Sequence, residues 1–316
     1  MKTRMIGASG LASSAIGLGC NRLFDPNNAA MVEAVLGALE LGINHFDSAD
    51  VYGQGRSESF LGAVLKGHRD EAIIVSKFGI TGPTGANGKP EYMKQVFDAS
   101  LKRLATDHID LYYFHRLDPG VPIEETVGAM AELVKAGKIK AIGLSNTNAE
   151  SIRRAHKVHP LAAVQMEYSL MERSAEKDVL PLCKELGISF VAYGPLTYAF
   201  LAGRIKKHED LPPGDRFRRS QSRFTDDNIR RNVGMLEALD EVSARKGATR
   251  AQVALAWCLH RPWDVLPIPG STRIEHVREN VAAAELELTK EQVARLDEAF
   301  APDRPSGDAS AASPVR

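Results

Sequence analysis

The stretch Ile109-Asp110-Leu111-Tyr112-Tyr113-Phe114-His115 is a mostly apolar run that ends on a titratable side chain. Short runs of this kind are typical of parallel strands that are covered on both faces. They alternate along the chain with longer segments of helical periodicity, which predicts βαβ units. The predicted strands are Ile16 to Gly19, Ile43 to Asp47, Ala72 to Lys77, Ile109 to His115, Ile139 to Leu144, Ala163 to Glu167, Ile188 to Tyr193 and Val265 to Ile268.

Eight strand–helix units in a chain of this length match a (β/α)8 barrel. We therefore predict an α/β fold, a TIM barrel, with residues 1–301 forming a single domain. The runs Thr3 to Ile6 and Leu11 to Ala15 flank Gly7-Ala8-Ser9-Gly10 and predict an N-terminal hairpin that plugs the barrel bottom. The segment Leu196 to Asp226 predicts a long active-site loop. Residues 302–316, rich in Pro, Ser, Asp and Ala, are expected to form a disordered tail.

The composition argues against several classes of partner. Lys plus Arg equals Asp plus Glu at 40 each, so no overall charge favours nucleic acid or an anionic membrane. No run approaches the roughly 18 apolar residues of a membrane span. The three cysteines, Cys20, Cys183 and Cys258, fit neither a disulfide framework nor CxxC metal spacing. We expect a cytoplasmic protein without a metal site.

Four polar residues lie at or just after the ends of three successive predicted strands: Asp47, Tyr52, Lys77 and His115. The carboxyl ends of barrel strands form the mouth where such barrels carry out chemistry. A single polar residue at a strand end is usually structural, but four on three adjacent strands favour an active site. The sequence therefore predicts one polar pocket.

The types of residue in this pocket suit proton transfer to a carbonyl oxygen. A free tyrosine has a pKa near 10, and we expect the Lys77 ammonium to lower the pKa of Tyr52. Asp47 would keep Lys77 charged and oriented, and His115 would hydrogen-bond the substrate oxygen. The set contains no nucleophile for hydrolysis. Two alternatives remain for attack on the carbonyl carbon: hydride from a nicotinamide cofactor, or Lys77 forming a Schiff base.

Several motifs resemble those of the aldo-keto reductase family over nearly the whole chain, and most closely its pyridoxal-reductase-like and auxin-induced-protein-like branch. They are Phe46-Asp47-Ser48-Ala49-Asp50-Val51-Tyr52-Gly53 with Ser57-Glu58 and Leu61-Gly62, Val75-Ser76-Lys77-Phe78-Gly79, Asp110 to Arg116, Gly137-Lys138-Ile139-Lys140 with Gly143-Leu144-Ser145-Asn146, and Pro267-Ile268-Pro269-Gly270-Ser271-Thr272.

This resemblance implies a carbonyl reductase that uses NADPH without a Rossmann domain, and no GxGxxG motif follows a strand here. It implies that Tyr52 is the general acid, that Lys77 and Asp47 tune it, and that His115 positions the carbonyl. Ser145, Asn146 and Gln165 match carboxamide-binding positions, and Tyr193 matches the aromatic residue that stacks on the nicotinamide. The residues expected to bind the cofactor are Ser145, Asn146, Gln165, Tyr193, Gly194, Pro195, Leu196, Gly270, Ser271, Thr272, Arg273, His276, Glu279 and Asn280.

The segment after the last predicted strand suits a phosphate. Ser271, Thr272 and Arg273 lie where a helix begins, so free backbone N–H groups and a guanidinium could bind the 2′-phosphate of NADPH. The alternative is an ordinary surface helix capped by Ser271. Asn280 and Glu279 are expected, by the resemblance, to contact the adenine.

The chain also departs from the family pattern. Relatives commonly have serine where this chain has Gly194, and small residues where it has Tyr198; His276 stands where other branches often have arginine. Preference for NADPH over NADH is therefore expected to depend mainly on Arg273.

The substrate and the oligomeric state are not predicted by the sequence, beyond a small-molecule carbonyl compound. The residues expected to line the substrate pocket are Asn21, Phe24, Phe78, Arg116 and Tyr198. A second class of function is a cofactor-binding regulatory subunit, because potassium-channel β subunits share this fold and many of its motifs.

Overall fold

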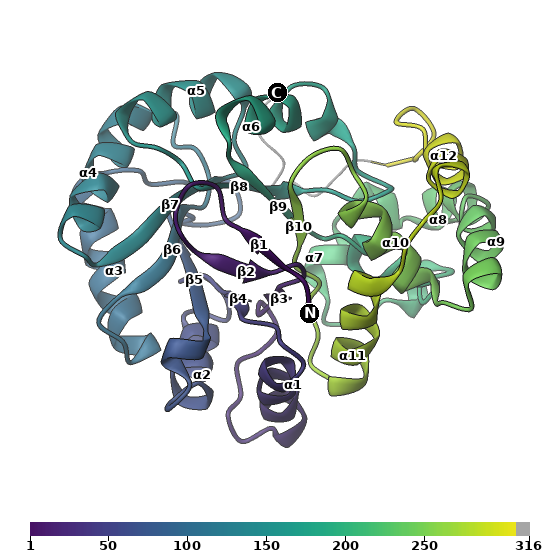
Figure 1. Cartoon of the computed structure of the whole chain (residues 1–316), viewed down its shortest axis with the longest axis horizontal. Helices are drawn as coiled ribbons and strands as arrows, with labels where there is room; N and C mark the ends of the chain where they lie inside the picture. The colour runs from purple at the N-terminus through teal and green to yellow at the C-terminus, as the bar shows by residue number, and fades with distance from the viewer. Residues whose placement is uncertain (308–316) are drawn as a thin grey trace.

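The computed structural model describes residues 1–307, and residues 308–316 of the predicted tail lie outside that range. Eight parallel strands form one sheet in sequential order, from β3 to β10 (Figure 1). Their bounds are β3 Leu18–Gly19, β4 His45–Asp47, β5 Ile73–Phe78, β6 Ile109–Phe114, β7 Ile139–Ser145, β8 Ala163–Glu167, β9 Ser189–Tyr193 and β10 Val265–Pro267. Each lies within two residues of a predicted strand.

The sheet closes on itself through glycine. Gly19, at the end of β3, forms a parallel bridge with Gly270, and the Gly17 N–H donates to Pro267 O at 3.0 Å. A Cβ on Gly19 would lie 2.8 Å from Ile268 O, so the close approach of the two segments requires glycine there. The predicted (β/α)8 barrel is confirmed.

Helices surround the strands, as the periodicity predicted (Figure 1). Their bounds are α1 Ala29–Glu40, α2 Arg56–Val64, α3 Pro90–Leu104, α4 Ile123–Lys135, α5 Ala149–Val158, α6 Val179–Leu186, α7 Arg216–Arg219, α8 Asp226–Val233, α9 Leu236–Lys246, α10 Arg250–Leu259, α11 Ile274–Ala282 and α12 Lys290–Ala299.

The N-terminal hairpin lies across the barrel in Figure 1, and Gly7 in its turn donates to Ser189 Oγ, at the start of β9. Strands β1 (Thr3–Met5) and β2 (Ala12–Ser14) pair antiparallel. Ile6 and Leu11, beside its turn, pack against the apolar residues that fill the barrel interior. The hairpin therefore closes the bottom of the barrel, as expected from the sequence.

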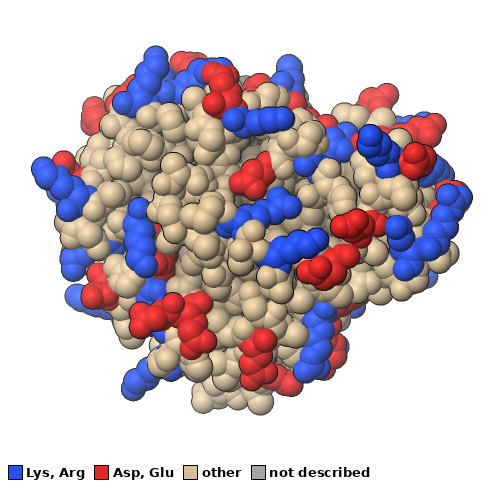
Figure 2. All heavy atoms as spheres, viewed as in Figure 1, with Lys and Arg blue, Asp and Glu red and all other residues tan. Residues whose placement is uncertain are grey.

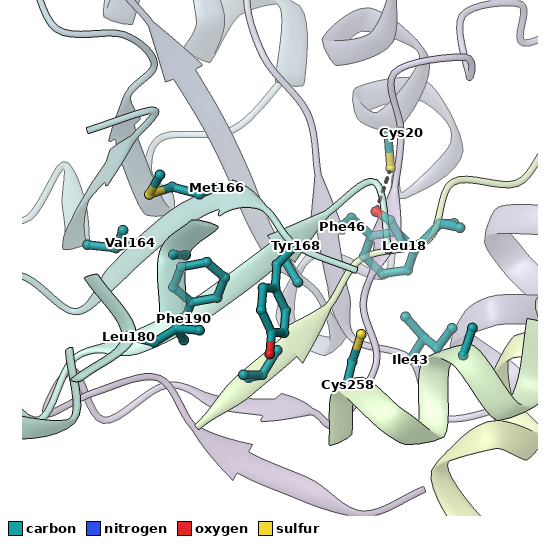
Figure 3. Close-up of a cluster of buried hydrophobic side chains, with 14 of the residues drawn as sticks. Leu18, Cys20, Ile43, Phe46, Val164, Met166, Tyr168, Leu180, Phe190 and Cys258 are labelled. Atoms are coloured by element: carbon teal, nitrogen blue, oxygen red, sulfur yellow. Dashed lines mark hydrogen bonds between the residues drawn. The ribbon is translucent and has the colours of Figure 1, made fainter. Parts of the chain in front are cut away.

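Strand alternation separates two apolar layers. Val75 of β5 and Leu111 of β6 belong to the interior cluster. Their sequence neighbours face the opposite way, into a larger cluster between strands and helices. Figure 3 shows part of that cluster, with Phe46 of β4 and Phe190 of β9 among the labelled side chains.

Two segments outside the strand–helix units contain local hydrogen-bonded structure. The stretch after β9 contains short helical turns, including η3 (Thr197–Ala199) and η5 (Ser222–Phe224), besides α7. The start of the predicted disordered tail is also held in place: Ser306 N–H donates to Asn232 Oδ1 at 2.8 Å, and Asn232 Nδ2 donates to Ser306 O at 2.9 Å. The buried amide of Asn232 thus binds the backbone of Ser306, and disorder of the tail stays a prediction.

Charged side chains are interspersed on the face shown in Figure 2, without a region of one sign. This agrees with the equal numbers of basic and acidic residues. None of the helices within residues 1–307 combines the length and hydropathy needed to cross a bilayer.

Candidate active site

The barrel mouth holds a buried ion pair between two neighbouring strands. Lys77 Nζ, at the end of β5, donates to Asp47 Oδ1 at 2.5 Å and to Ser48 O at 2.7 Å. The exposed fractions of the two side chains are 0% and 2%, so the charges are almost fully removed from water. Such a pair is stable only when both charges are matched and hydrogen-bonded, as they are here.

Tyr52 and His115 lie beside this pair. Lys77 Nζ is 5.1 Å from the centroid of the Tyr52 ring, and the rings of Tyr52 and His115 meet edge to face with centroids 5.8 Å apart. The four residues come from the ends of β4, β5 and β6 and from the loop that follows β4. The structure brings all of them together, as the sequence indicated.

The electrostatics of Tyr52 differ from the expectation. Its pKa is raised well above the usual value, first by burial and then by the negative charge of Asp47. The predicted lowering by Lys77 was wrong because Asp47 neutralises the ammonium at hydrogen-bond distance. Removal of the phenol from water then dominates. Tyr52 therefore remains a protonated donor throughout the neutral pH range.

His115 is held in the neutral form. Its pKa is lowered well below the usual value, first by burial and then by the positive charges of Lys77 and Arg116. Its buried Nδ1 has no hydrogen-bond partner within residues 1–307. A neutral imidazole carries one N–H, so His115 can donate one hydrogen bond to an oxygen in the pocket.

The predicted carboxamide-binding residues form one network at the ends of β7, β8 and β9. Tyr193 donates through its hydroxyl to Asn146 Oδ1 at 2.8 Å, and Asn146 Nδ2 donates to Ser145 Oγ and to His115 O, both at 3.1 Å. Gln165 Nε2 donates to Asp47 Oδ2 at 2.7 Å, a link that the sequence did not indicate. The network joins the predicted cofactor residues to the ion pair.

The loop after β9 has an unusual backbone. Gly194 has a φ of +63°, and three consecutive non-glycine residues, Thr197, Tyr198 and Ala199, have φ values of +47°, +52° and +79°. Each non-glycine residue with a positive φ lowers the stability of the fold by about 1 to 3 kcal/mol, and such strained residues cluster at functional sites. A Cβ on Gly194 would lie 3.5 Å from Tyr198 Cζ, so this ring lies against the predicted cofactor loop.

A chain of polar contacts ties that loop to the segment after β3, which lies on the other side of β10. Arg218 of α7 donates to Tyr198 O at 3.0 Å and pairs with Asp215 at 2.7 Å. Asp215 also pairs at 2.6 Å with Arg22, which follows β3. We call this chain of contacts, from Arg22 through Asp215 and Arg218 to Tyr198, the clasp. The sequence showed the basic run at α7 but not the clasp, because Arg22 and Asp215 lie nearly two hundred positions apart.

The beginning of α11 suits a phosphate group. Its N-cap residue is Arg273, and no side chain caps its first N–H groups. Ser271 Oγ instead accepts from Arg273 N–H at 3.1 Å and donates to Arg273 O at 2.9 Å. The alternative of a helix capped by Ser271 is therefore wrong, and the free N–H groups fit an anion.

Other predicted cofactor residues lie around this helix. Gly270 forms the closing bridge with Gly19, and Asn280 is buried on α11. Arg204, from the loop after β9, donates to His276 Nε2 at 2.8 Å and was not predicted as a site residue. The loop after β9 also contains Pro195 and Leu196. Thr272 precedes α11, and Glu279 lies on it.

The structure places the predicted substrate residues in different surroundings. Phe78 is fully buried on the outer side of the barrel, with ring centroids 5.2 Å from those of Tyr112 and Phe114. Its assignment was wrong because it follows the inward Lys77, and neighbouring strand residues face opposite sides. Arg116 donates to Pro83 O at 2.9 Å, which engages its guanidinium with the loop after β5.

Two further candidates remain near the mouth. Phe24 is half-buried beside Gly53, the residue after Tyr52. The Arg56 guanidinium lies over its ring, 4.9 Å from the centroid. Asn21 is exposed, and its Oδ1 lies 3.4 Å from the Cβ position of Gly270, on the side of the predicted phosphate site.

Comparisons with known proteins identify relatives of this chain and of its fold. The family model for the aldo/keto reductase family matches residues 15–301. The fold is similar to that of the holo form of aldo-keto reductase AKR11C1 from Bacillus halodurans, at 32% identity and a TM-score of 0.79 over 96% of this chain and 97% of that one.

Two other solved structures are also similar. The aldo/keto reductase from Klebsiella pneumoniae in complex with NADP and acetate is 31% identical, with a TM-score of 0.73 over 96% of each chain. The glycerol dehydrogenase AKR11B4 from Gluconobacter oxydans is 26% identical, with a TM-score of 0.86 over 97% of each chain.

Proposed function

Because the chain belongs to the aldo/keto reductase family, we propose that it reduces aldehydes or ketones to alcohols, with Tyr52 as the proton donor. The protein is an NADP-dependent oxidoreductase. When bound, NADPH supplies the hydride that attacks the carbonyl carbon. Residues 1–301 act as one catalytic domain in this proposal.

The observation that carries the proposal is the packing of Tyr52 and His115 around the Lys77–Asp47 pair. As negative charge develops on the carbonyl oxygen, the phenol of Tyr52 gives up its proton to that oxygen. The resulting phenolate is formed beside the Lys77 ammonium, 5.1 Å from the ring centroid, which offsets part of the cost of burying the negative charge.

His115 orients the substrate. Its neutral imidazole donates a hydrogen bond to the same carbonyl oxygen and so fixes the carbonyl group relative to Tyr52. The charge state matters, because a neutral histidine directs the substrate without competing with Tyr52 as the acid.

The remaining positions that match family motifs hold the cofactor in this proposal. Ser145 and Asn146 bind the carboxamide, and Tyr193 packs on the nicotinamide while its hydroxyl stays on Asn146. Gln165 binds the carboxamide through its side-chain carbonyl oxygen in this proposal, because its amide nitrogen donates to Asp47. The uncapped start of α11 and Arg273 bind the 2′-phosphate.

The Schiff-base alternative is disfavoured by the surroundings of Lys77. A lysine must be neutral to attack a carbonyl carbon. Lys77 instead donates to a buried carboxylate and to a backbone carbonyl, and both acceptors favour the ammonium form.

A direct test follows the absorbance of NADPH while the protein is given a panel of aldehydes, quinones, ketosteroids and pyridoxal. The proposal predicts oxidation of NADPH that depends on at least one of these carbonyl compounds and yields the alcohol. Tight NADPH binding without turnover on the whole panel would instead point to a regulatory subunit.

A further inference from the structure

Three basic residues from two separate segments lie near the start of α11. Arg204 Nη2 lies 2.8 Å from His276 Nε2, and Arg273 is the N-cap residue of the same helix. A guanidinium can only donate, so His276 Nε2 accepts and its ring proton lies on Nδ1. His276 is therefore neutral in this arrangement.

The two guanidinium groups of this cluster have no carboxylate partner in the part of the chain that the structure describes. Within residues 1–307, neither Arg204 nor Arg273 forms an ion pair with a carboxylate, whereas arginines such as Arg103, Arg173 and Arg218 do. Glu275 and Glu279 act on His276 electrostatically but do not pair with either guanidinium. Together with the uncapped helix start, this arrangement indicates a site for an anionic ligand group.

On the premise of the proposed NADPH-dependent function, we propose that Arg204 is a specificity-determining residue for the 2′-phosphate and that its hydrogen bond to His276 makes phosphate binding proton-linked. When the phosphate dianion enters, Arg204 leaves His276 Nε2 and donates to a phosphate oxygen. His276 Nε2 takes up one proton from solvent and then donates to the phosphate as well.

The electrostatics of the free site give the direction of the linkage. The pKa of free His276 is lowered by burial first and then by Arg204, with a smaller contribution from Arg273; Glu279 and Glu275 raise it. A bound phosphate dianion adds negative charge and raises the pKa of His276 in the complex. Binding therefore takes up a proton, and NADPH affinity falls as the pH rises through the pKa of the bound form.

The test measures dissociation constants of NADPH and NADH by nucleotide fluorescence from about pH 6.5 to about pH 8, above the phosphate's own pKa of about 6. NADH lacks the 2′-phosphate, so the ratio of its dissociation constant to that of NADPH isolates the site. We expect the wild-type ratio to fall about tenfold over this range, the effect of one unit of pKa difference. His276→Gln keeps an acceptor for Arg204 but cannot titrate, so its ratio should be flat.

A second pair of variants tests Arg204 itself. Arg204→Gln should weaken NADPH binding about tenfold and leave NADH binding unchanged, as expected for one lost charged hydrogen bond. Arg278→Gln removes an exposed arginine from the same helix and should change both nucleotides less than about twofold.

Either of two results would overturn the inference: a wild-type ratio independent of pH, or equal losses for NADH and NADPH in Arg204→Gln. A wild-type protein that binds neither nucleotide would defeat the proposed function as well. The two failures are therefore distinguishable.

Discussion

Lys77 and Asp47, on adjacent strands, form a buried 2.5 Å ion pair that also receives Gln165 Nε2 at the second oxygen of Asp47. The pair therefore links the proposed proton donor to the proposed cofactor residues. Because Asp47 balances the charge of Lys77, the pair has no net charge, and the pKa of Tyr52 is therefore not lowered.

Asp47→Asn should destabilise the fold by about 3 to 5 kcal/mol, because it leaves the Lys77 ammonium buried without a counter-charge. The free energy of unfolding in urea measures this effect. The double variant Asp47→Asn/Lys77→Met removes both charges and should be more stable than Asp47→Asn alone. A single variant as stable as the wild type would show that the pair is not buried as described.

Asp50 gives a pH-dependent prediction for stability. Burial, followed by the negative charge of Glu58, raises the pKa of Asp50 to about 7 from 3.8. The folded protein thus binds a proton that the unfolded chain has released, so stability should fall as the pH rises between about 4 and 7. Asp50→Asn should remove this slope and be the more stable form at pH 8, as measured by urea unfolding across pH. An unchanged slope would contradict the assignment.

Ala199→Gly should stabilise the protein by about 1 to 2 kcal/mol, because glycine tolerates the left-handed backbone that alanine adopts there. Ala105→Gly is a matched control, since Ala105 ends α3 with a φ of +51° outside the cofactor loop. Both variants should raise the melting temperature. Only Ala199→Gly should also change the rate of NADPH release in stopped-flow fluorescence. Equal release rates in the two variants would show that the backbone strain at Ala199 does not affect cofactor release.

Breaking the clasp should speed nucleotide release with little loss of stability. The Arg22 side chain is 55% exposed, so its pair with Asp215 adds less than about 1 kcal/mol to folding. Arg22→Ala should nevertheless raise the NADPH dissociation rate several-fold, because the loop bearing Tyr198 loses its link to the segment after β3. Arg230→Ala, which removes an exposed pair on α8, should leave this rate unchanged. An unaltered rate in Arg22→Ala would show that the clasp does not restrain the cofactor.

The sequence predicted the barrel because each strand is short, apolar and followed by a helical period. The same alternation rule would have excluded Phe78 from the pocket once Lys77 was placed inward. The hairpin could be predicted because Ile6 and Leu11 flank a glycine-bearing turn and must bury somewhere.

Contacts between distant loops could not be predicted. Arg204 meets His276, and Arg22 meets Asp215, only because the barrel brings strand ends together. The sequence also predicted the wrong direction for the pKa shift of Tyr52. That shift depends on the distance between Asp47 and Lys77, which a sequence pattern does not give.

The most direct measurement is the single-turnover rate of NADPH oxidation by Tyr52→Phe with a carbonyl substrate that the wild type reduces. Loss of the phenolic proton donor should slow this step by about 10² to 10⁴-fold, while the melting temperature and the NADPH dissociation constant stay at wild-type values. A Tyr52→Phe rate within a few-fold of the wild type would contradict the account, because the proton would then come from another group.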